Sequence, residues 1–336
     1  MSLTSELNDP NSPLNRFLER ELPSTSRITG SLRRQLPLRP VTVTPHTDGR
    51  PDYRSLGRAI DRRLRVALGS PVDSALLEGV LFAGIDVAEM ASPSAGQTVH
   101  SVGQALLSEL KGQPAASGGS MTRSHGDEER LSRLCFAASH FEEVKRVGLN
   151  PGNPLLHLGT DAVLDDLLGQ VPAYVSDDIA RQVELAEADH ALGWATHLPI
   201  DKRNCAPVFS GSNDVDGADA DFILDGHLID CKATTRPDRF GSMKEVYQLA
   251  AYLLLDYEDE FGMDKIGFYL SRQGRLVTWS TREFLDLLGA RQPLSKLRAT
   301  LGEALSDTAV ATDPQQPIPP HGTQHSLFDE DEGDSD

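Results

Sequence analysis

The stretch 217–235 constrains the fold more than any other part of the chain. It contains two short runs, 220–224 and 227–232, that are rich in branched or aromatic side chains. Between them lies Asp225-Gly226, a dipeptide that favours the left-handed backbone of a tight hairpin turn. We therefore expect two antiparallel strands joined by this turn.

The turn also fixes the register of the expected hairpin. If Asp225 and Gly226 form the loop, Leu224 pairs with His227, and the outward steps place Asp221 opposite Asp230 and Asp219 opposite Lys232. Side chains alternate between the two faces of a strand. One face is expected to be polar and the other apolar, with the members Asp219, Asp221, Asp230 and Lys232 against Phe222, Leu224, Ile229 and Cys231.

The facing carboxylates of Asp221 and Asp230 need a chemical reason, because like charges directly opposite each other across a strand pair are destabilising. A divalent cation supplies one, since two carboxylates about 5 Å apart at the Cβ level can share Mg²⁺ or Mn²⁺. Lys232 lies two residues after Asp230 and on the same face. It can stabilise a developing phosphorane charge or help to deprotonate the attacking water.

The spacing Asp-x8-Asp-x-Lys on a hairpin resembles the catalytic signature of the PD-(D/E)xK nuclease superfamily. Asp221 stands at the first acid, Asp230 and Lys232 stand at the second acid and the lysine, and Ala220 replaces the proline. The resemblance implies a Mg²⁺- or Mn²⁺-dependent phosphodiester hydrolase acting on DNA. It also implies that Asp221 and Asp230 are metal ligands.

A second motif narrows the resemblance. Sixteen residues after Lys232 comes Gln248, followed by Tyr252 in GluValTyrGlnLeuAlaAlaTyr. This spacing resembles the Gln-x3-Tyr helix of the RecB-like exonuclease branch, which follows the lysine strand and reaches the DNA and the active site. The resemblance covers about half the chain, roughly residues 150–285 by pattern matching. It implies catalytic roles for Gln248 and Tyr252 beside Asp221, Asp230 and Lys232.

The same resemblance implies one more metal ligand, a Glu or a His, from a helix before the hairpin. A segment similar to the Gly-Thr-x-x-His-x-x-Leu-Glu helix of the branch is present, but Val163 stands at the histidine and Leu167 at the glutamate. The remaining candidates are Glu184 or Glu187, which share a helical face because they are three residues apart, with His157 behind them. The choice between them stays open.

The order of expected elements defines the fold class and the domains. The pattern of a helix, three strands, a helix and further strands predicts an α/β fold with a mixed sheet, and the resemblance refines this to a restriction-endonuclease-like αβββαβ core. A small helical region precedes the core, and both termini are expected to be disordered. The expected parts are a disordered or extended arm at 1–50, a helical N-terminal region at 51–111, a flexible linker at 112–129, the nuclease-like domain at 130–306 and a disordered acidic tail at 307–336.

Composition places the chain among soluble enzymes of the cell interior. No apolar run approaches the length of a membrane span, and the N-terminus lacks the pattern of a secretory signal. Its 3 cysteines are far apart, which excludes a zinc ribbon, a four-cysteine cluster and a disulfide framework. We therefore expect a cytoplasmic protein with no membrane partner.

The net charge of −18 argues against a polyanionic partner, but the charges are unevenly distributed. Residues 14–67 hold 12 arginines against 5 acids, whereas residues 307–336 hold 8 acids and neither Lys nor Arg. Four of the arginines lie beside the apolar stripe of an expected helix at 53–68, namely Arg54, Arg58, Arg62 and Arg65. This basic segment is a candidate phosphate-contacting arm, and its bland alternative is a set of solubilising surface charges.

The acidic tail carries a second candidate motif. Gln324, Leu327 and Phe328 resemble the Gln-x-x-Leu-Phe peptide by which bacterial replication and repair proteins dock on the sliding clamp. Two adjacent apolar side chains in a polar segment have no core to join, so a partner pocket is a reasonable destination. The alternative is a chance apolar pair in a tail that shields basic surface.

These observations leave two classes of function open. The preferred reading is a metal-dependent deoxyribonuclease in DNA repair, recombination or defence against foreign DNA. The alternative is a catalytically weak or inactive nuclease-fold protein that binds DNA or acts as an adaptor.

Overall fold

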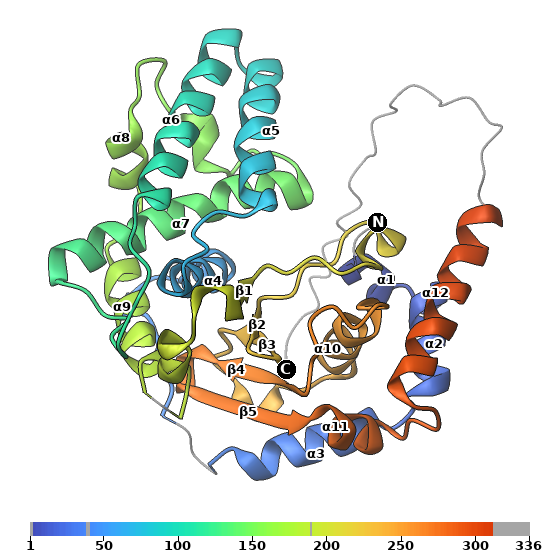
Figure 1. The fold of residues 1–336 in the computed structure, drawn as a ribbon. Helices are drawn as coiled ribbons and strands as arrows, with labels where there is room; N and C mark the ends of the chain where they lie inside the picture. Colours follow the sequence, from blue (N-terminus) through green and yellow to red (C-terminus); the bar gives the residue numbers. More distant parts are fainter. Residues whose placement is uncertain (1–2, 38–40, 189, 312–336) are drawn as a thin grey trace, which may run out of the picture.

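A computed structural model describes residues 3–37, 41–188 and 190–311, with side chains up to residue 306. Within these residues, five strands form one mixed sheet in the order β1-β2-β3-β4-β5 (Figure 1). The strands are β1 (Arg203–Cys205), β2 (Phe222–Leu224), β3 (His227–Lys232), β4 (Lys265–Leu270) and β5 (Arg275–Ser280). The predicted mixed α/β class is confirmed.

The pairing directions show how the sheet is built. Strands β1, β2 and β3 are antiparallel neighbours, whereas β4 pairs in parallel with β3 and antiparallel with β5. Two parallel strands need a long crossover, because the chain must return to the end of the sheet where the first strand began before the second strand can start. Helix α10 (Met243–Leu255) supplies that crossover between β3 and β4.

One face of the sheet joins a first hydrophobic core. The sheet residues Phe222, Leu224, Ile229 and Tyr269 are buried in it with apolar side chains from the helices on this side. These helices come before the sheet in the sequence (Figure 1). They are α4 (Tyr53–Leu68), α5 (Ser74–Met90), α6 (Pro93–Lys111), α7 (His125–Val147), α8 (Leu164–Gly169) and α9 (Tyr174–Ala186).

The opposite face joins a second core. Ile223 and Leu228 alternate with the residues of the first core along β2 and β3, as the strand period requires. Here the helices come from both ends of the chain, and they are α1 (Leu3–Asn8), α2 (Pro13–Glu21), α3 (Thr25–Gln35), α10, α11 (Thr281–Leu288) and α12 (Leu294–Ala311). The sheet therefore lies between two helical layers.

The expected arm at 1–50 is wrong for residues 3–35, which form α1, α2 and α3. In α2, Leu14, Phe17 and Leu18 recur at helical spacing and are at most 1% exposed. The Ser12 hydroxyl accepts a hydrogen bond from the Asn15 amide at 3.0 Å and so caps the helix. Short amphipathic helices with many charges resemble an arm in composition, but their apolar faces complete the second core.

The expected division into a helical region, a linker and a nuclease-like domain also needs correction. Helix α7 begins at His125, within the proposed linker, and Met121 is 2% exposed. Helices α4 to α9 share one continuous core with the sheet. Because the linker is tied down at Met121 and the core crosses it, the structure has no boundary at 112–129.

The first strand differs from the expected one. The composition of residues 205–211 is typical of a strand, but β1 ends at Cys205. Beyond it the pairing is irregular, with the Ala206 amide donating to the Asp221 carbonyl at 3.0 Å and an isolated bridge joining Val208 to Asp219. Pro207 has no amide hydrogen for a ladder, and Ala206 adopts a positive φ of 50°. The regular ladder therefore ends at Cys205, although residues 206–208 continue beside 219–221.

None of the helices in the described ranges combines the length and apolar character needed to cross a membrane. The expected clamp-binding residues Gln324, Leu327 and Phe328, and the acidic tail from residue 312 onward, lie outside the described residues.

Candidate functional site

The hairpin that was expected at the centre of the chain has the expected register. Leu224 pairs with His227, and Phe222 pairs with Ile229. Asp225 and Gly226 form the turn with positive φ values of 46° and 79°. The predicted apolar face is confirmed, since Phe222 and Ile229 join the first core. The opposite face is not polar throughout, because Ile223 and Leu228 are buried in the second core.

The structure departs from the expectation at the open end of the hairpin. The ladder of β2 begins at Phe222, and the side chain of Asp221 accepts a hydrogen bond at Oδ2 from the Cys231 amide at 2.7 Å. Asp219 does not pair with Lys232 but bridges to Val208. The two strands diverge here because the segment before β2 follows residues 206–208, as the Asp219 bridge shows.

Four of the five predicted catalytic residues form one polar chain. Lys232 Nζ lies 2.8 Å from Asp230 Oδ2 and donates a hydrogen bond to Gln248 Oε1 at 3.1 Å. Gln248 Nε2 donates in turn to the Tyr252 hydroxyl at 2.9 Å. Gln248 and Tyr252 of α10 are 16 and 20 positions after Lys232 in sequence. Their side chains therefore meet those of β3 at the end of that strand.

Helix α10 places Gln248 and Tyr252 on one face because they are four residues apart. Its start is fixed by Ser242, whose amide donates to Glu245 Oε2 at 2.5 Å. Leu249 and Leu253, one position further along, are fully buried in the second core. This packing sets the rotation of α10 and turns Gln248 toward the end of β3.

Asp230, the acid of this polar chain, is 2% exposed. Its Oδ2 lies 2.8 Å from Lys232 Nζ, and no other polar partner of this oxygen is present among the described residues. Burial raises the pKa of Asp230 and the negative charge of Asp221 raises it as well, while Lys232 opposes both, and the resulting pKa is about 7. Asp230 is thus a carboxyl group that changes charge near neutral pH.

Lys232 and Tyr252 both keep their protons at neutral pH. Burial lowers the pKa of Lys232, but the charges of Asp230 and Asp221 outweigh it and raise the value to about 12. Burial, together with the charges of Asp230 and Asp221, raises the pKa of Tyr252 well above its ordinary value. Lys232 is therefore a cation here, which favours charge stabilisation over the removal of a proton from water.

Asp221, the fifth predicted residue, contacts a residue that the sequence did not single out as part of the site. Arg65 of α4 lies 3.4 Å from Asp221 Oδ1 through Nη2. The same guanidinium lies 2.8 Å from Asp61 and 2.7 Å from Asp73. Arg65 is 3% exposed, so it is a buried cation shared by three carboxylates. The four-residue spacing of Asp61 and Arg65 was the only local signal of this cluster.

Neighbouring arginines of α4 are buried in ion pairs as well, so the basic arm that composition suggested is wrong for them. Arg62 and Arg63 are at most 1% exposed. Arg62 pairs with Asp73 at 3.1 Å and with Glu142, and Arg63 pairs with Glu128 at 2.6 Å. Acids distant in sequence neutralise these arginines, and that pairing is invisible to a count of charges.

The proposed upstream ligands, Glu184 and Glu187, lie at the end of α9. Glu184 is exposed, Glu187 is partly exposed, and no described interaction joins either of them to Asp221 or Asp230. Instead, Asp61 supplies the carboxylate whose charge acts on Asp221 from the helical layer. The described residues contain no group of three His, Cys, Asp or Glu side chains arranged to hold a metal ion.

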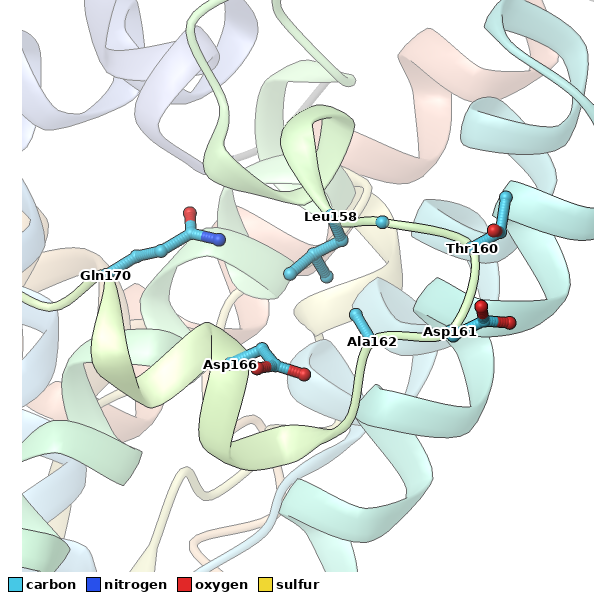
Figure 2. A pocket seen from close by; sticks show the side chains of 7 residues that line it. Leu158, Thr160, Asp161, Ala162, Asp166 and Gln170 are labelled. Atoms are coloured by element: carbon cyan, nitrogen blue, oxygen red, sulfur yellow. The ribbon is translucent and has the colours of Figure 1, made fainter.

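A surface hollow of about 440 Å³ lies far along the chain from these residues, between the 158–162 loop and α8. Figure 2 shows Leu158 and Gln170 at its walls, with Asp161 and Asp166 on the loop and helix. Asp166 is engaged in capping α8, since its Oδ2 accepts from the Val163 amide at 2.8 Å. The hollow contains none of the five predicted site residues.

Comparison with known proteins gives no relative from which a role can be taken. No protein-family model matches the chain, and no curated protein or solved structure matches it significantly. The functional argument therefore depends on the residues and their geometry.

Proposed function

We propose that this protein is a metal-dependent nuclease that hydrolyses phosphodiester bonds of DNA. The observation that carries the proposal is the polar chain formed by Asp230, Lys232, Gln248 and Tyr252. Two motifs chosen for their resemblance to a nuclease signature are far apart in sequence, yet their side chains are in contact. A buried carboxylate beside an ammonium group is also costly to maintain without a functional return.

The order of elements supports the same proposal. A helix, the antiparallel strands β1, β2 and β3, the crossover helix α10 and the parallel strand β4 follow one another as in the αβββαβ core that the resemblance implies. The proposed site lies at the carboxyl end of β3. Ligands of open α/β sheets commonly bind outside the carboxyl ends of strands.

The carboxylates fit a hard cation that keeps part of its water shell. Asp230 offers a buried oxygen whose described partner is Lys232, and the charge of Asp221 reaches it. Magnesium is often held by one or two carboxylates together with substrate phosphates, so a third protein ligand is not required. Mg²⁺ or Mn²⁺ held by Asp221 and Asp230 would lower the pKa of a bound water and neutralise phosphate charge.

The other residues then have separate roles. Lys232, as an ammonium group, binds a non-bridging oxygen of the scissile phosphate and stabilises the charge that develops there. Gln248 holds Lys232 in place through its Oε1 and orients the Tyr252 hydroxyl through its Nε2. Tyr252 keeps its own hydrogen for donation to the substrate, because its pKa is raised well above the ordinary value by burial first and by Asp230 and Asp221.

Cleavage assays on linear and circular DNA with Mg²⁺, Mn²⁺ or EDTA test the proposal. We expect cation-dependent cleavage that falls by at least about a hundredfold in Asp230→Asn and Lys232→Ala. Asp225→Asn is a matched control, because Asp225 is an exposed acid of the same hairpin and Asn also tolerates its positive φ. Absence of cation-dependent cleavage of every DNA and RNA form would refute the nuclease proposal.

A specific contact favours a second candidate, an inactive nuclease-fold protein that binds DNA or recruits partners. Asp221 already has the Cys231 amide at one oxygen and Arg65 at the other, so a cation would have to displace Arg65. An adaptor would keep its cellular phenotype in Lys232→Ala, whereas an enzyme would lose it. DNA binding without cleavage in the wild type would select this candidate.

The tail motif supports a further part of the proposal, recruitment to the bacterial sliding clamp through Gln324, Leu327 and Phe328. An apolar pair next to an acidic run can enter a pocket, and the cost of ordering the segment keeps such binding transient. A peptide of residues 318–336 should bind a bacterial clamp saturably. Changing Leu327 and Phe328 together to Ala should abolish that binding, and equal binding by both peptides would contradict this role.

A further inference from the structure

Helices α4 and α7 lie beside the proposed site. A Cβ built on Gly57 of α4 would lie 3.9 Å from the Ala233 side chain, directly after Lys232. One and two turns further on, Asp61 and Arg65 face Asp221. The N-terminal half of α4 therefore runs past the carboxyl end of β3, where a substrate of the proposed site would lie.

Arg58, on this half of α4, is a partly buried cation without a counter-ion. Its described hydrogen bond is to the Ser139 carbonyl of α7, at 3.4 Å, and no described carboxylate forms an ion pair with it. Burial lowers the pKa of Arg58, and the positive charges of Arg146 and Arg54 lower it further, although Glu143 and Glu142 oppose them. A guanidinium in this state gains from an added anion.

Arg146 and Arg54 extend the positive charge around Arg58. Arg146, at the end of α7, has a side chain that is 48% exposed and lies 3.7 Å from Asp219. The Tyr252 hydroxyl is close enough to influence the pKa of Arg146, which burial lowers but Asp219 and Glu142 raise. Arg54 is 71% exposed and lies 3.8 Å from Glu143. The ion pairs of Arg146 and Arg54 are long and exposed, so they are weak.

The other arginines of the region show that Arg58 is different. Arg62, Arg63 and Arg65 each have a carboxylate partner within 3.1 Å. Arg203 has no carboxylate, but it donates to three backbone carbonyls, at distances of 2.6 to 3.0 Å. Arg58 has one long bond to a carbonyl and donors to spare.

We propose that Arg58, with Arg146 beside it, binds a backbone phosphate of the nucleic acid next to the scissile bond. This inference rests on the proposed nuclease function, and it assigns to that site the residues that hold its substrate in place. A planar guanidinium can give two parallel hydrogen bonds to a phosphate. Such a contact fixes register without reading sequence, so Arg58 is a positioning residue.

Binding measured by fluorescence anisotropy in EDTA tests the inference without cleavage. The probes are duplex DNA, single-stranded DNA and single-stranded RNA of equal length, with inorganic phosphate as competitor, over a range of salt concentrations. The variants are Arg58→Ala, Arg58→Lys and Arg146→Ala. Arg133→Ala is the matched control. Arg133 of α7 also donates to a backbone carbonyl, that of Leu168, at 3.3 Å, but it pairs with Glu129. It lies about 20 Å from Arg146 along the helix.

We expect Arg58→Ala to weaken DNA binding about tenfold and to reduce the slope of log affinity against log salt by about one. Arg146→Ala should act in the same direction, Arg58→Lys should keep the slope, and Arg133→Ala should bind like the wild type. Thermal unfolding of each variant identifies any loss of folding. If Arg58→Ala is unfolded, Arg58→Lys decides. Binding about threefold weaker than the wild type in a folded protein supports a two-bond contact, and wild-type affinity overturns it.

The outcomes separate this inference from the nuclease proposal. Wild-type binding by folded Arg58→Ala, or no nucleic-acid binding by the wild type, overturns the inference even if cleavage is observed. Arg58-dependent binding without any cleavage supports the inference and refutes the nuclease proposal. Equal loss of binding to DNA and to RNA in Arg58→Ala indicates that the phosphate alone is recognised. Competition by inorganic phosphate with an unchanged slope of log affinity against log salt would show an adventitious anion site, which overturns the inference.

Discussion

At the scale of single residues, the buried carboxyl of Asp230 links the proposed site to the stability of the fold. Its carboxyl is buried beside Lys232, and burial raises its pKa to about 7. Between about pH 4 and pH 7, the folded state therefore keeps a proton that the unfolded state has lost. Stability that is present below the unfolded pKa is lost as the pH rises through the folded pKa.

This sign gives a pH-dependent prediction. The gain in stability of Asp230→Asn over the wild type should be smallest at about pH 4, where the loss in the wild type begins, and should grow toward about pH 8. Urea unfolding at both pH values measures the difference. Asp225→Asn, an exposed acid of the same turn, should show no such gain, and an equal gain in both variants would contradict the assignment to Asp230.

A second prediction concerns Arg65, the cation shared by Asp61, Asp73 and Asp221. Arg65→Met should lower the free energy of unfolding by about 3–5 kcal/mol, because it leaves carboxylates without their buried partner. Arg54→Met on the same helix, with a side chain 71% exposed, should change it by less than about 0.5 kcal/mol. Chemical denaturation decides, and similar effects for both variants would show that the Arg65 cluster is not a structural centre.

At the scale of elements, packing between helices is set by contacts that sequence periodicity does not report. Helices α5 and α6 approach closely where Gly84 and Gly96 face each other. A Cβ at Gly96 would lie 2.4 Å from the Gly84 carbonyl oxygen and 2.5 Å from the Ala88 side chain. Both helices lie in the helical region that the sequence predicts at 51–111, but the distance between them was not predictable from it.

The close approach predicts opposite effects for two glycine substitutions. Gly96→Ala should destabilise the protein by about 1–3 kcal/mol, since backbone atoms must move to admit the methyl group. Gly126→Ala, in the first turn of α7, has nothing within 4 Å of the added atom and should be neutral or stabilising by up to about 1 kcal/mol. Thermal unfolding of the two variants measures the difference, and a stabilising Gly96→Ala would refute the contact.

At the scale of the whole molecule, both ends of the described chain complete the second core. Helix α2 packs against α12, and the Trp279 indole of β5 donates to the Ser31 hydroxyl of α3 at 2.9 Å. Residues 14–32 precede the first strand of the sheet by more than 170 positions in sequence. The N-terminal helices are therefore part of the folded unit that positions α10.

This arrangement predicts that Leu18→Ala lowers the free energy of unfolding by about 2–5 kcal/mol, because Leu18 is fully buried. Arg16→Ala on the exposed face of the same helix should cost less than about 0.5 kcal/mol. Urea unfolding followed by tryptophan fluorescence reports both. A disordered arm, as composition suggested, would give no effect for either variant.

Turn, strand and helix geometry read from the sequence determined the hairpin and the faces of β3 and α10. Turn chemistry at Asp225-Gly226 set the hairpin register, and strand alternation then placed Asp230 and Lys232 on one face. The four-residue spacing of Gln248 and Tyr252 put both on one side of α10. These features involve residues within a turn, a strand or a helix, where geometry is repetitive and can be read from spacing.

Only the tertiary structure decided the partners of charges and of amphipathic faces. Arg65 and Asp221 are separated by 156 positions, and Arg63 and Glu128 by 65. The burial of α2 likewise depends on helices at the other end of the chain. Long-range pairing depends on the path of the whole backbone, so composition gave the arginines and the N-terminal helices the appearance of a solvated arm when their neighbours make them core.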